Sequence, residues 1–193
     1  MTLVEVLGRR AASDPDAQYF SVYGQTYPYA GVWSESLRCA TGLAQAGVGV
    51  GDKVGLIYPT CAEFFYAFLG ALRLGAVPVP LYPTLGAEGT ANILRDSEAV
   101  AVATISWFRR GVDEAAGACA GVKAVLEPSD LEVNAPPPAL PVVRPEDIAF
   151  IQYTSGSTGH PRGVVLSHAN VGETARFMAE AAALTREDRV VSW

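Results

Sequence analysis

The chain has 193 residues, half of them hydrophobic and 18% charged. That length fits one domain with a substantial core, and the composition excludes wholesale disorder, which requires low hydrophobicity and high net charge. The formal net charge is −6, which disfavours tight binding to nucleic-acid phosphates.

The sequence pattern of residues 1–80 predicts alternating strands and helices. Thr60 and Glu63 form a capping box, so we expect a helix to open there, and its sequence AEFFYAFLGALRL is apolar nearly all round, which is typical of a buried helix. Gly75 ends that helix, and Pro78 weakens the strand that follows. The expected elements are a hairpin at 18–29, a helix at 33–44, a strand at 53–58, a helix at 62–74 and a strand at 76–80.

The pattern continues beyond residue 80. The expected elements are a helix at 90–97, a strand at 99–105, a helix at 112–119, a strand at 122–126, strands at 147–153 and 163–167, and a strand that begins at 189. A proline-rich segment at 135–145 predicts an extended connector. Asn170, with Glu173 three residues later, is expected to cap a helix with an apolar stripe of Val171, Ala175, Met178 and Ala182. Alternating strands and helices predict an α/β fold: a mostly parallel sheet with flanking helices.

The cysteines and the apolar segments limit the class of protein. Cys39, Cys61 and Cys119 are far apart and form no CxxC pair, so we expect neither a zinc site nor a disulfide framework. Cys39 and Cys61 lie among apolar residues, and we expect both to be small core residues. The longest apolar stretch, 64–72, is too short to span a bilayer, and the first residues are too polar for a secretory signal. We therefore expect a cytoplasmic protein with no membrane span.

The segment at 153–163, YTSGSTGHPRG, has the composition of a phosphate-binding loop. Its glycines allow backbone N–H groups to converge on one point, its hydroxyls add neutral donors, and its arginine adds a forked cation. A polyphosphate is the expected ligand, and the alternative is a flexible surface linker. The candidate phosphate-binding residues are Thr154, Ser155, Gly156, Ser157, Thr158, Gly159, Arg162 and Gly163.

Three other motifs do not fit the sequence. A Walker loop requires G-x4-G-K-[ST] before a helix, whereas Arg162 is followed by Gly163 and a strand. A nucleophile elbow requires G-x-S-x-G, and Ser157 lacks that spacing, although a serine hydrolase acting through Ser155 or Ser157 is the weaker alternative. The glycines at 47–51 precede a strand instead of following one, the reverse of a dinucleotide fingerprint.

The loop sequence YTSGSTGHPRGV resembles the phosphate-loop signature of the adenylate-forming superfamily, which includes acyl-CoA synthetases, peptide-synthetase adenylation domains, fatty acyl-AMP ligases and luciferases. The family more often has Lys at the position of Arg162, which keeps the charge but alters the geometry. The segment from Gly47 to Pro83 also looks like the early core of that family, so the resemblance extends over roughly 19–193. FIQYTSGSTG together with PVPLYP is most similar to fatty acyl-AMP ligases, because adenylation domains more often carry an acidic residue near Tyr82.

The resemblance implies that a carboxylic acid, a fatty acid in the first instance, attacks the α-phosphorus of ATP to give an acyl-adenylate and pyrophosphate. It implies Mg²⁺ with the ATP and transfer of the acyl group to an acyl carrier protein. The alternatives are transfer to coenzyme A, as in acyl-CoA synthetases, or activation of an amino acid.

The family's later motifs have no matching positions here: the adenine pocket, the magnesium-linked Glu, the ribose-binding Asp and the catalytic Lys. We therefore expect residues 1–193 to be the N-terminal part of an AMP-dependent synthetase/ligase domain, with no catalytic residue and no metal ligand of its own. Such a chain is not expected to complete adenylation alone. A truncated, non-catalytic remnant is the alternative, and so is a natural terminus with Trp193 packed at a sheet edge.

Three remaining features have ordinary structural interpretations. His160 is expected to lie in the loop facing solvent, and His168 to pack at a helix entry. The aromatic cluster at 64–68 could line an acyl tunnel, but its helical spacing is typical of an ordinary core.

Overall fold

The centre of the protein is a parallel sheet of four strands. The computed structural model describes residues 1–133, 135–154, 161–185, 188 and 190. The strand order is β4-β3-β5-β6, and each neighbouring pair is parallel. The strands are β3 (Lys53–Ile57), β4 (Val77–Leu81), β5 (Ala99–Thr104) and β6 (Ala124–Leu126). The predicted α/β class with a mostly parallel sheet is confirmed.

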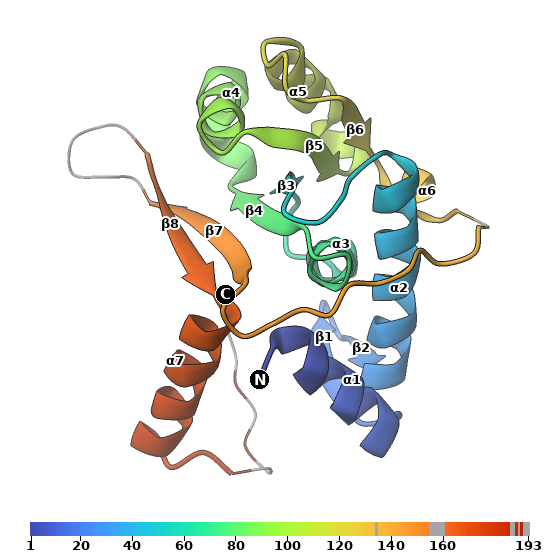
Figure 1. Cartoon of the computed structure of the whole chain (residues 1–193), viewed down its shortest axis with the longest axis vertical. Coiled ribbons are helices and arrows are strands. Elements are labelled where there is room, and N and C mark those ends of the chain that lie inside the picture. Colours follow the sequence, from blue (N-terminus) through green and yellow to red (C-terminus); the bar gives the residue numbers. More distant parts are fainter. Residues whose placement is uncertain (134, 155–160, 186–187, 189, 191–193) are drawn as a thin grey trace.

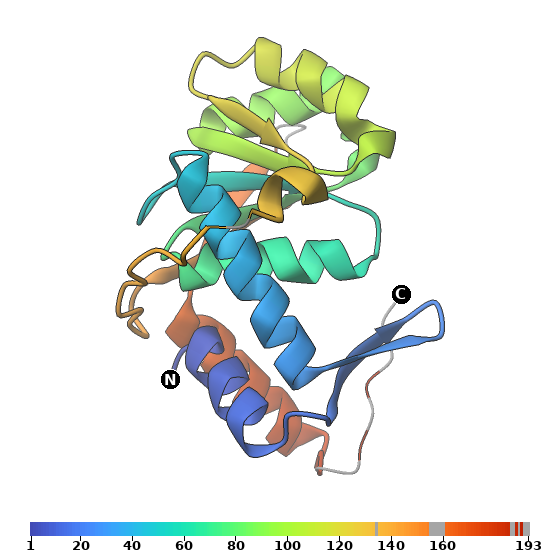
Figure 2. The ribbon, with the colours of Figure 1, turned by 90° about the vertical axis from the view of Figure 1, so that its right-hand side faces the viewer.

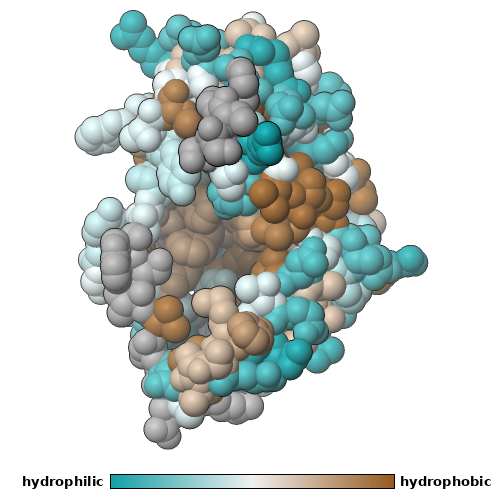
Figure 3. All heavy atoms as spheres, turned by 90° about the vertical axis from the view of Figure 1, so that its left-hand side faces the viewer, coloured by the Kyte–Doolittle hydropathy of each residue, from teal (hydrophilic) through white to brown (hydrophobic). Residues whose placement is uncertain are grey.

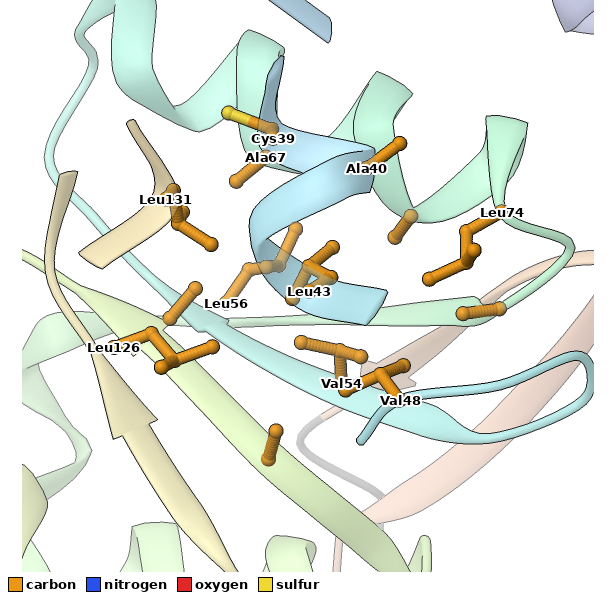
Figure 4. Close-up of a cluster of buried hydrophobic side chains, with 14 of the residues drawn as sticks. Cys39, Ala40, Leu43, Val48, Val54, Leu56, Ala67, Leu74, Leu126 and Leu131 are labelled. Atoms are coloured by element: carbon orange, nitrogen blue, oxygen red, sulfur yellow. The ribbon is translucent and has the colours of Figure 1, made fainter. Parts of the chain in front are cut away.

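Helices cover both faces of this sheet (Figures 1 and 2). One face carries α2 (Tyr29–Gln45) and α3 (Ala62–Arg73), and the other carries α4 (Gly86–Asp96) and α5 (Ser106–Gly117). Because both faces are covered, the strand residues are mostly apolar and buried, apart from ends such as Lys53. Leu43 and Leu56 are completely buried in the cluster between α2, α3 and the sheet (Figure 4). A second cluster fills the opposite side beneath α4 and α5.

A third layer forms beside α3. It contains α1 (Leu3–Ser13) and the antiparallel hairpin of β1 (Gln18–Val22) and β2 (Gln25–Pro28). These elements pack on α2, α3 and β7 through a cluster that includes Leu7 and Val32. The hairpin at 18–29 was predicted, whereas α1 was not.

The chain then forms a separate antiparallel pair, β7 (Ile148–Thr154) and β8 (Arg162–Ser167), followed by α7 (His168–Ala181). Short helical segments at Pro83–Leu85 and Pro128–Leu131 complete the elements. β7 lies next to β4 but shares no ladder with it, so side chains join the hairpin to the central sheet. Figure 1 shows the hairpin beside the sheet, with α7 leading away from it.

Two predicted helix caps are wrong. Cys61, not Thr60, is the N-cap of α3 and makes no side-chain cap hydrogen bond. Ser167 caps α7: its hydroxyl accepts a hydrogen bond from the N–H of Asn170, whose side chain accepts one in return from the N–H of Ser167. Asn170 is therefore the third helical residue and not the cap.

Several predicted boundaries also differ. α4 begins four residues before the predicted Thr90, and α5 begins six before the predicted Val112, because neither start carries a side-chain cap that the sequence could reveal. β6 begins two residues later than predicted. The predicted stripe of α7 is only partly covered: Val171 packs against the third cluster, whereas Met178 is 61% exposed. The strand predicted from 189 falls on positions that lie mainly outside the described residues.

The cysteines are free thiols. Cys39 is buried as predicted, whereas Cys61, which was also predicted to be a core residue, is only half-buried at the start of α3. Cys119 is buried as well. Within the described part of the chain, no helix has the length and apolarity needed to cross a bilayer.

Candidate functional site

The predicted phosphate loop joins β7 to β8. Thr154 is the last residue of β7 and Arg162 the first of β8, and the two are partners in the antiparallel register. Both side chains are exposed at this end of the hairpin. The predicted residues between them, Ser155, Gly156, Ser157, Thr158 and Gly159, lie outside the described residues, as does His160.

Arg162 places a cation at this end of the hairpin. Among the residues that the structure describes, no carboxylate pairs with its guanidinium. Its forked donors are therefore open to an anion from outside, and a guanidinium matches the geometry of phosphate oxygens.

Alternate residues of β7 face the interior, as the two-residue period of a strand requires. Ala149, Ile151 and Tyr153 are 0%, 8% and 9% exposed. The ring of Tyr153 lies against Gly163 on β8: a Cβ at Gly163 would stand 3.1 Å from this ring and 3.0 Å from Cγ2 of Ile151. A side chain at this position would require the ring of Tyr153 or the side chain of Ile151 to shift by a few tenths of an ångström, so the packing favours a small residue here, whatever the loop binds.

The hydroxyl of Tyr153 donates a hydrogen bond to Oδ2 of Asp96 on α4, at 2.5 Å. Burial of the ring raises the pKa of Tyr153, and the hydrogen bond and charge of Asp96 raise it further. The phenol is therefore neutral and a donor at physiological pH. Sequence reasoning missed Asp96, because it lies 57 residues away in the chain and no local motif marks it.

A series of hollows begins at the base of the loop. The first, of about 110 Å³, is lined by residues that include Tyr82, Thr154 and Pro161. It shares Pro80, Leu81 and Tyr82 with a second hollow of about 390 Å³, which lies where β3 and β4 end and includes Gln152. Figure 3 shows this face of the molecule, hollowed and with hydrophobic residues in the hollow. Ligands of open parallel sheets bind at such carboxyl ends.

The aromatic cluster at the start of α3 is not an ordinary core. Phe64 and Phe65 are only half-buried, and both line the second hollow and a third one of about 220 Å³ next to α1. Phe64 and Phe68 also pack against the core beneath α3. The cluster thus has one buried side and one side that faces open space.

His168 has the predicted packing role. It is 1% exposed, and its Nδ1 accepts a hydrogen bond from the N–H of Leu3 at 3.2 Å. Burial lowers its pKa, and this effect outweighs the opposing charges of Asp147 and Glu5. The imidazole therefore joins the start of α7 to the start of α1.

Comparison with known proteins assigns the family. A family model described as AMP-binding enzyme matches residues 7–193. The chain belongs to the AMP-binding enzyme family. The predicted resemblance to adenylate-forming enzymes is thereby confirmed, and the β7–β8 hairpin is the part of this AMP-binding fold that carries the signature sequence.

Individual relatives show how wide the family is. The chain is 37% identical to 4-coumarate--CoA ligase 3 from Oryza sativa over 159 residues, which are 75% of this chain and 28% of that protein. It is 37% identical to long-chain-fatty-acid--AMP ligase FadD26 from Mycobacterium marinum over 155 residues, 77% of this chain and 26% of that one. A putative long-chain-fatty-acid CoA ligase from Rhodopseudomonas palustris has the same fold, with a TM-score of 0.87, 28% identity, and coverage of 97% of this chain and 50% of that one.

The chain therefore spans about a quarter of the length of the two curated relatives and half of the solved structure. In the described part of the chain, no three His, Cys, Asp or Glu side chains gather as ligands for a metal ion.

Proposed function

We propose that this chain binds the phosphates of ATP at residues 153–163 for the activation of a carboxylic acid as its adenylate. The observation that carries the proposal is the family signature YTSGSTGHPRG at the junction of β7 and β8, where Arg162 is exposed and has no ion pair among the described residues. The roles of Thr154, Ser155, Gly156, Ser157, Thr158, Gly159, Arg162 and Gly163 in phosphate binding belong to this proposal.

In the proposed reaction, a carboxylate oxygen forms a bond to the α-phosphorus while the bond to the oxygen that bridges to the β-phosphorus breaks. Pyrophosphate leaves with that electron pair, and no proton needs to move. The loop hydroxyls, its N–H groups and Arg162 would stabilise the charge that collects on pyrophosphate. Mg²⁺ bound to the ATP would neutralise phosphate oxygens. The contribution of this chain is thus positional and electrostatic.

We further propose that the acid is a fatty acid and that an acyl carrier protein accepts the acyl group. The apolar hollows next to Thr154 and Tyr82 support an apolar acid over a charged amino acid. The relative named as a long-chain-fatty-acid--AMP ligase supports the fatty acid, whereas the 4-coumarate--CoA ligase supports the alternative, an aryl acid passed to coenzyme A.

Binding of nucleotides to the chain tests the phosphate site. A site for the β- and γ-phosphates predicts tighter binding of MgATP than of AMP, with pyrophosphate as a competitor, measured by equilibrium dialysis. Arg162→Ala should weaken MgATP binding by roughly ten- to a hundredfold, the value of a hydrogen bond to a charged group. Arg162→Lys should lose far less. The matched control is Arg110→Ala, which removes an exposed arginine from α5.

Equal binding by the wild type and Arg162→Ala would show that Arg162 does not face the phosphates. Equal affinity for AMP and ATP would place the nucleotide's phosphate tail elsewhere. ATP–pyrophosphate exchange with fatty, aryl and amino acids, measured on an enzyme that carries these residues together with the rest of the AMP-binding domain, tests the substrate class. In that enzyme, Arg162→Ala should lower the exchange rate roughly 10²- to 10³-fold, as for loss of one preorganised donor.

A further inference from the structure

The hydrogen bond between Tyr153 and Asp96 joins the hairpin to the helical layer of the protein. The ladder of β7 binds only β8, and this pair forms its own sheet. Among the described residues, the bond from Tyr153 is the one side-chain hydrogen bond that links either strand to an element outside the hairpin and α7. It lies one residue before Thr154, at the loop end of the hairpin.

The place of Asp96 in α4 supports a specific role for its carboxylate. Asp96 is the last residue of the helix. A negative charge at a helix C-terminus is unfavourable, because the unpaired carbonyls there already carry partial negative charge. Within the described residues, Asp96 has no ion pair that would offset this cost. The hydrogen bond from Tyr153 is thus the interaction that accounts for an acid at this position.

The ring of Tyr153 packs between β8 and the cluster beneath α4 and α5. Gly163 leaves room for the ring against β8, and Ile151 flanks the same space on β7. The phenol belongs to the buried cluster beneath α4 and α5. Its hydroxyl emerges at a hollow of about 510 Å³ that is lined by Asn92, Ile93, Arg95, Asp96, Tyr153 and Pro161. One side chain therefore contacts β8 with its ring and α4 with its hydroxyl.

We propose that Tyr153 and Asp96 are positioning residues that fix the loop end of the β7–β8 hairpin against α4, and so set where Thr154 and Arg162 meet the phosphates of ATP. That the pair fixes the hairpin against α4 follows from the geometry alone. That this contact positions the phosphate-binding residues rests on the proposed function. The proposed ligand is still a nucleoside triphosphate. What is new is that Tyr153 and Asp96 align the residues that bind its phosphates.

Hydrogen exchange of the 193-residue chain tests, without nucleotide, whether the pair fixes the hairpin against α4. The variants are Tyr153→Phe, which removes only the hydroxyl, and Asp96→Ala, which removes the acceptor. Each should speed exchange of the amides of β7 and β8 near the loop by roughly tenfold, in keeping with one lost charge-assisted hydrogen bond. Exchange in β3 and β5 should not change. Tyr23→Phe is the control, since that tyrosine is 90% exposed.

Two further variants separate a specific bond from general loosening. The double variant Tyr153→Phe with Asp96→Ala should exchange no faster than either single variant, because both remove the same bond. Asp96→Asn keeps an acceptor oxygen and should restore most of the protection. Additive effects, equal acceleration in β3 and β5, or no acceleration at all would overturn the inference.

MgATP binding to the same variants tests whether this contact positions the phosphate-binding residues. Weaker binding by Tyr153→Phe and Asp96→Ala, with recovery in Asp96→Asn and no change in Tyr23→Phe, is the expected result. Normal ATP affinity in variants whose hairpin exchanges faster would show a purely structural link and would overturn the positioning role. Failure of the wild type to bind ATP would instead overturn the proposed function, and the exchange results would still report on the bond itself.

Discussion

Gly70 on α3 lies in close contact with α2, and replacing it with alanine tests the packing that supports the sheet. A Cβ at this position would stand 2.7 Å from Cβ of Cys39, 2.9 Å from the backbone nitrogen of Ala40 and 3.0 Å from the carbonyl oxygen of Ser36. Two of these three atoms belong to the backbone of α2, so no rotamer change relieves the contact. The helices would have to separate by several tenths of an ångström.

The size of the effect follows from two opposing contributions. Alanine in a helix interior is about 1 kcal/mol more favourable than glycine. Overpacking a close-packed core typically costs about 1–3 kcal/mol, and the backbone contact puts Gly70 at the upper end. We therefore expect Gly70→Ala to lower the free energy of unfolding by about 2 kcal/mol.

Gly111 supplies the matched control. It is also a helix-interior glycine, in α5, but a Cβ there would have nothing within 4 Å. Gly111→Ala should raise the free energy of unfolding by about 0.5–1 kcal/mol, because only the propensity contribution acts. Urea denaturation followed by circular dichroism measures both variants. A Gly70→Ala variant as stable as Gly111→Ala would refute the close approach of the two helices.

Two further predictions concern protonation. Burial lowers the pKa of His168, so its neutral form stabilises the fold fully above about pH 6.5, and that contribution is lost as the pH falls through 6.5 towards the lower folded pKa. His168→Gln should therefore show a smaller loss of unfolding free energy on acidification than the wild type, and an equal loss would contradict this. Burial raises the pKa of Cys39 to about 12 and that of Cys61 to about 11. Both thiols should be alkylated by iodoacetamide at least a hundredfold more slowly in the native than in the urea-unfolded chain near pH 8, as read by mass spectrometry, and similar rates would show that the thiols are accessible.

Local sequence signals were sufficient for the strands of the central sheet and for the two strands that precede and follow residues 155–160. The apolar strand at 53–57 and the hairpin around the signature are visible because their hydrophobic periods and turn residues are local. Helix α1 was missed, although the sequence contains a signal for its start. Thr2 and Glu5 form a complete capping box, which the pattern T-x-x-E predicts. At the start of α7, Ser167 and Asn170 compete for the same role, and sequence alone favoured the wrong one.

Other features depend on tertiary contacts that no local pattern encodes. The need for a small residue at Gly70 comes from the nearby backbone of α2, and the tight packing at Gly163 comes from the ring of Tyr153 on the neighbouring strand. The bond from Tyr153 to Asp96 requires two segments that are distant in the chain to meet across a layer. The open side of the aromatic cluster on α3 likewise depends on where α1 and β4 lie. Helical periodicity shows which residues share one face of a helix, but it does not show what packs against that face.

The most direct test of the central claim locates the phosphates of ATP on the protein. Substituting Mn²⁺ for Mg²⁺ in the bound nucleotide broadens nuclear magnetic resonance signals from amides close to the metal–phosphate group. We predict that the amides of Thr154, Arg162 and Gly163 broaden first, and that broadening weakens in Arg162→Ala. Selective broadening of residues 47–51, or of any region away from the β7–β8 hairpin, would contradict a phosphate site at this loop.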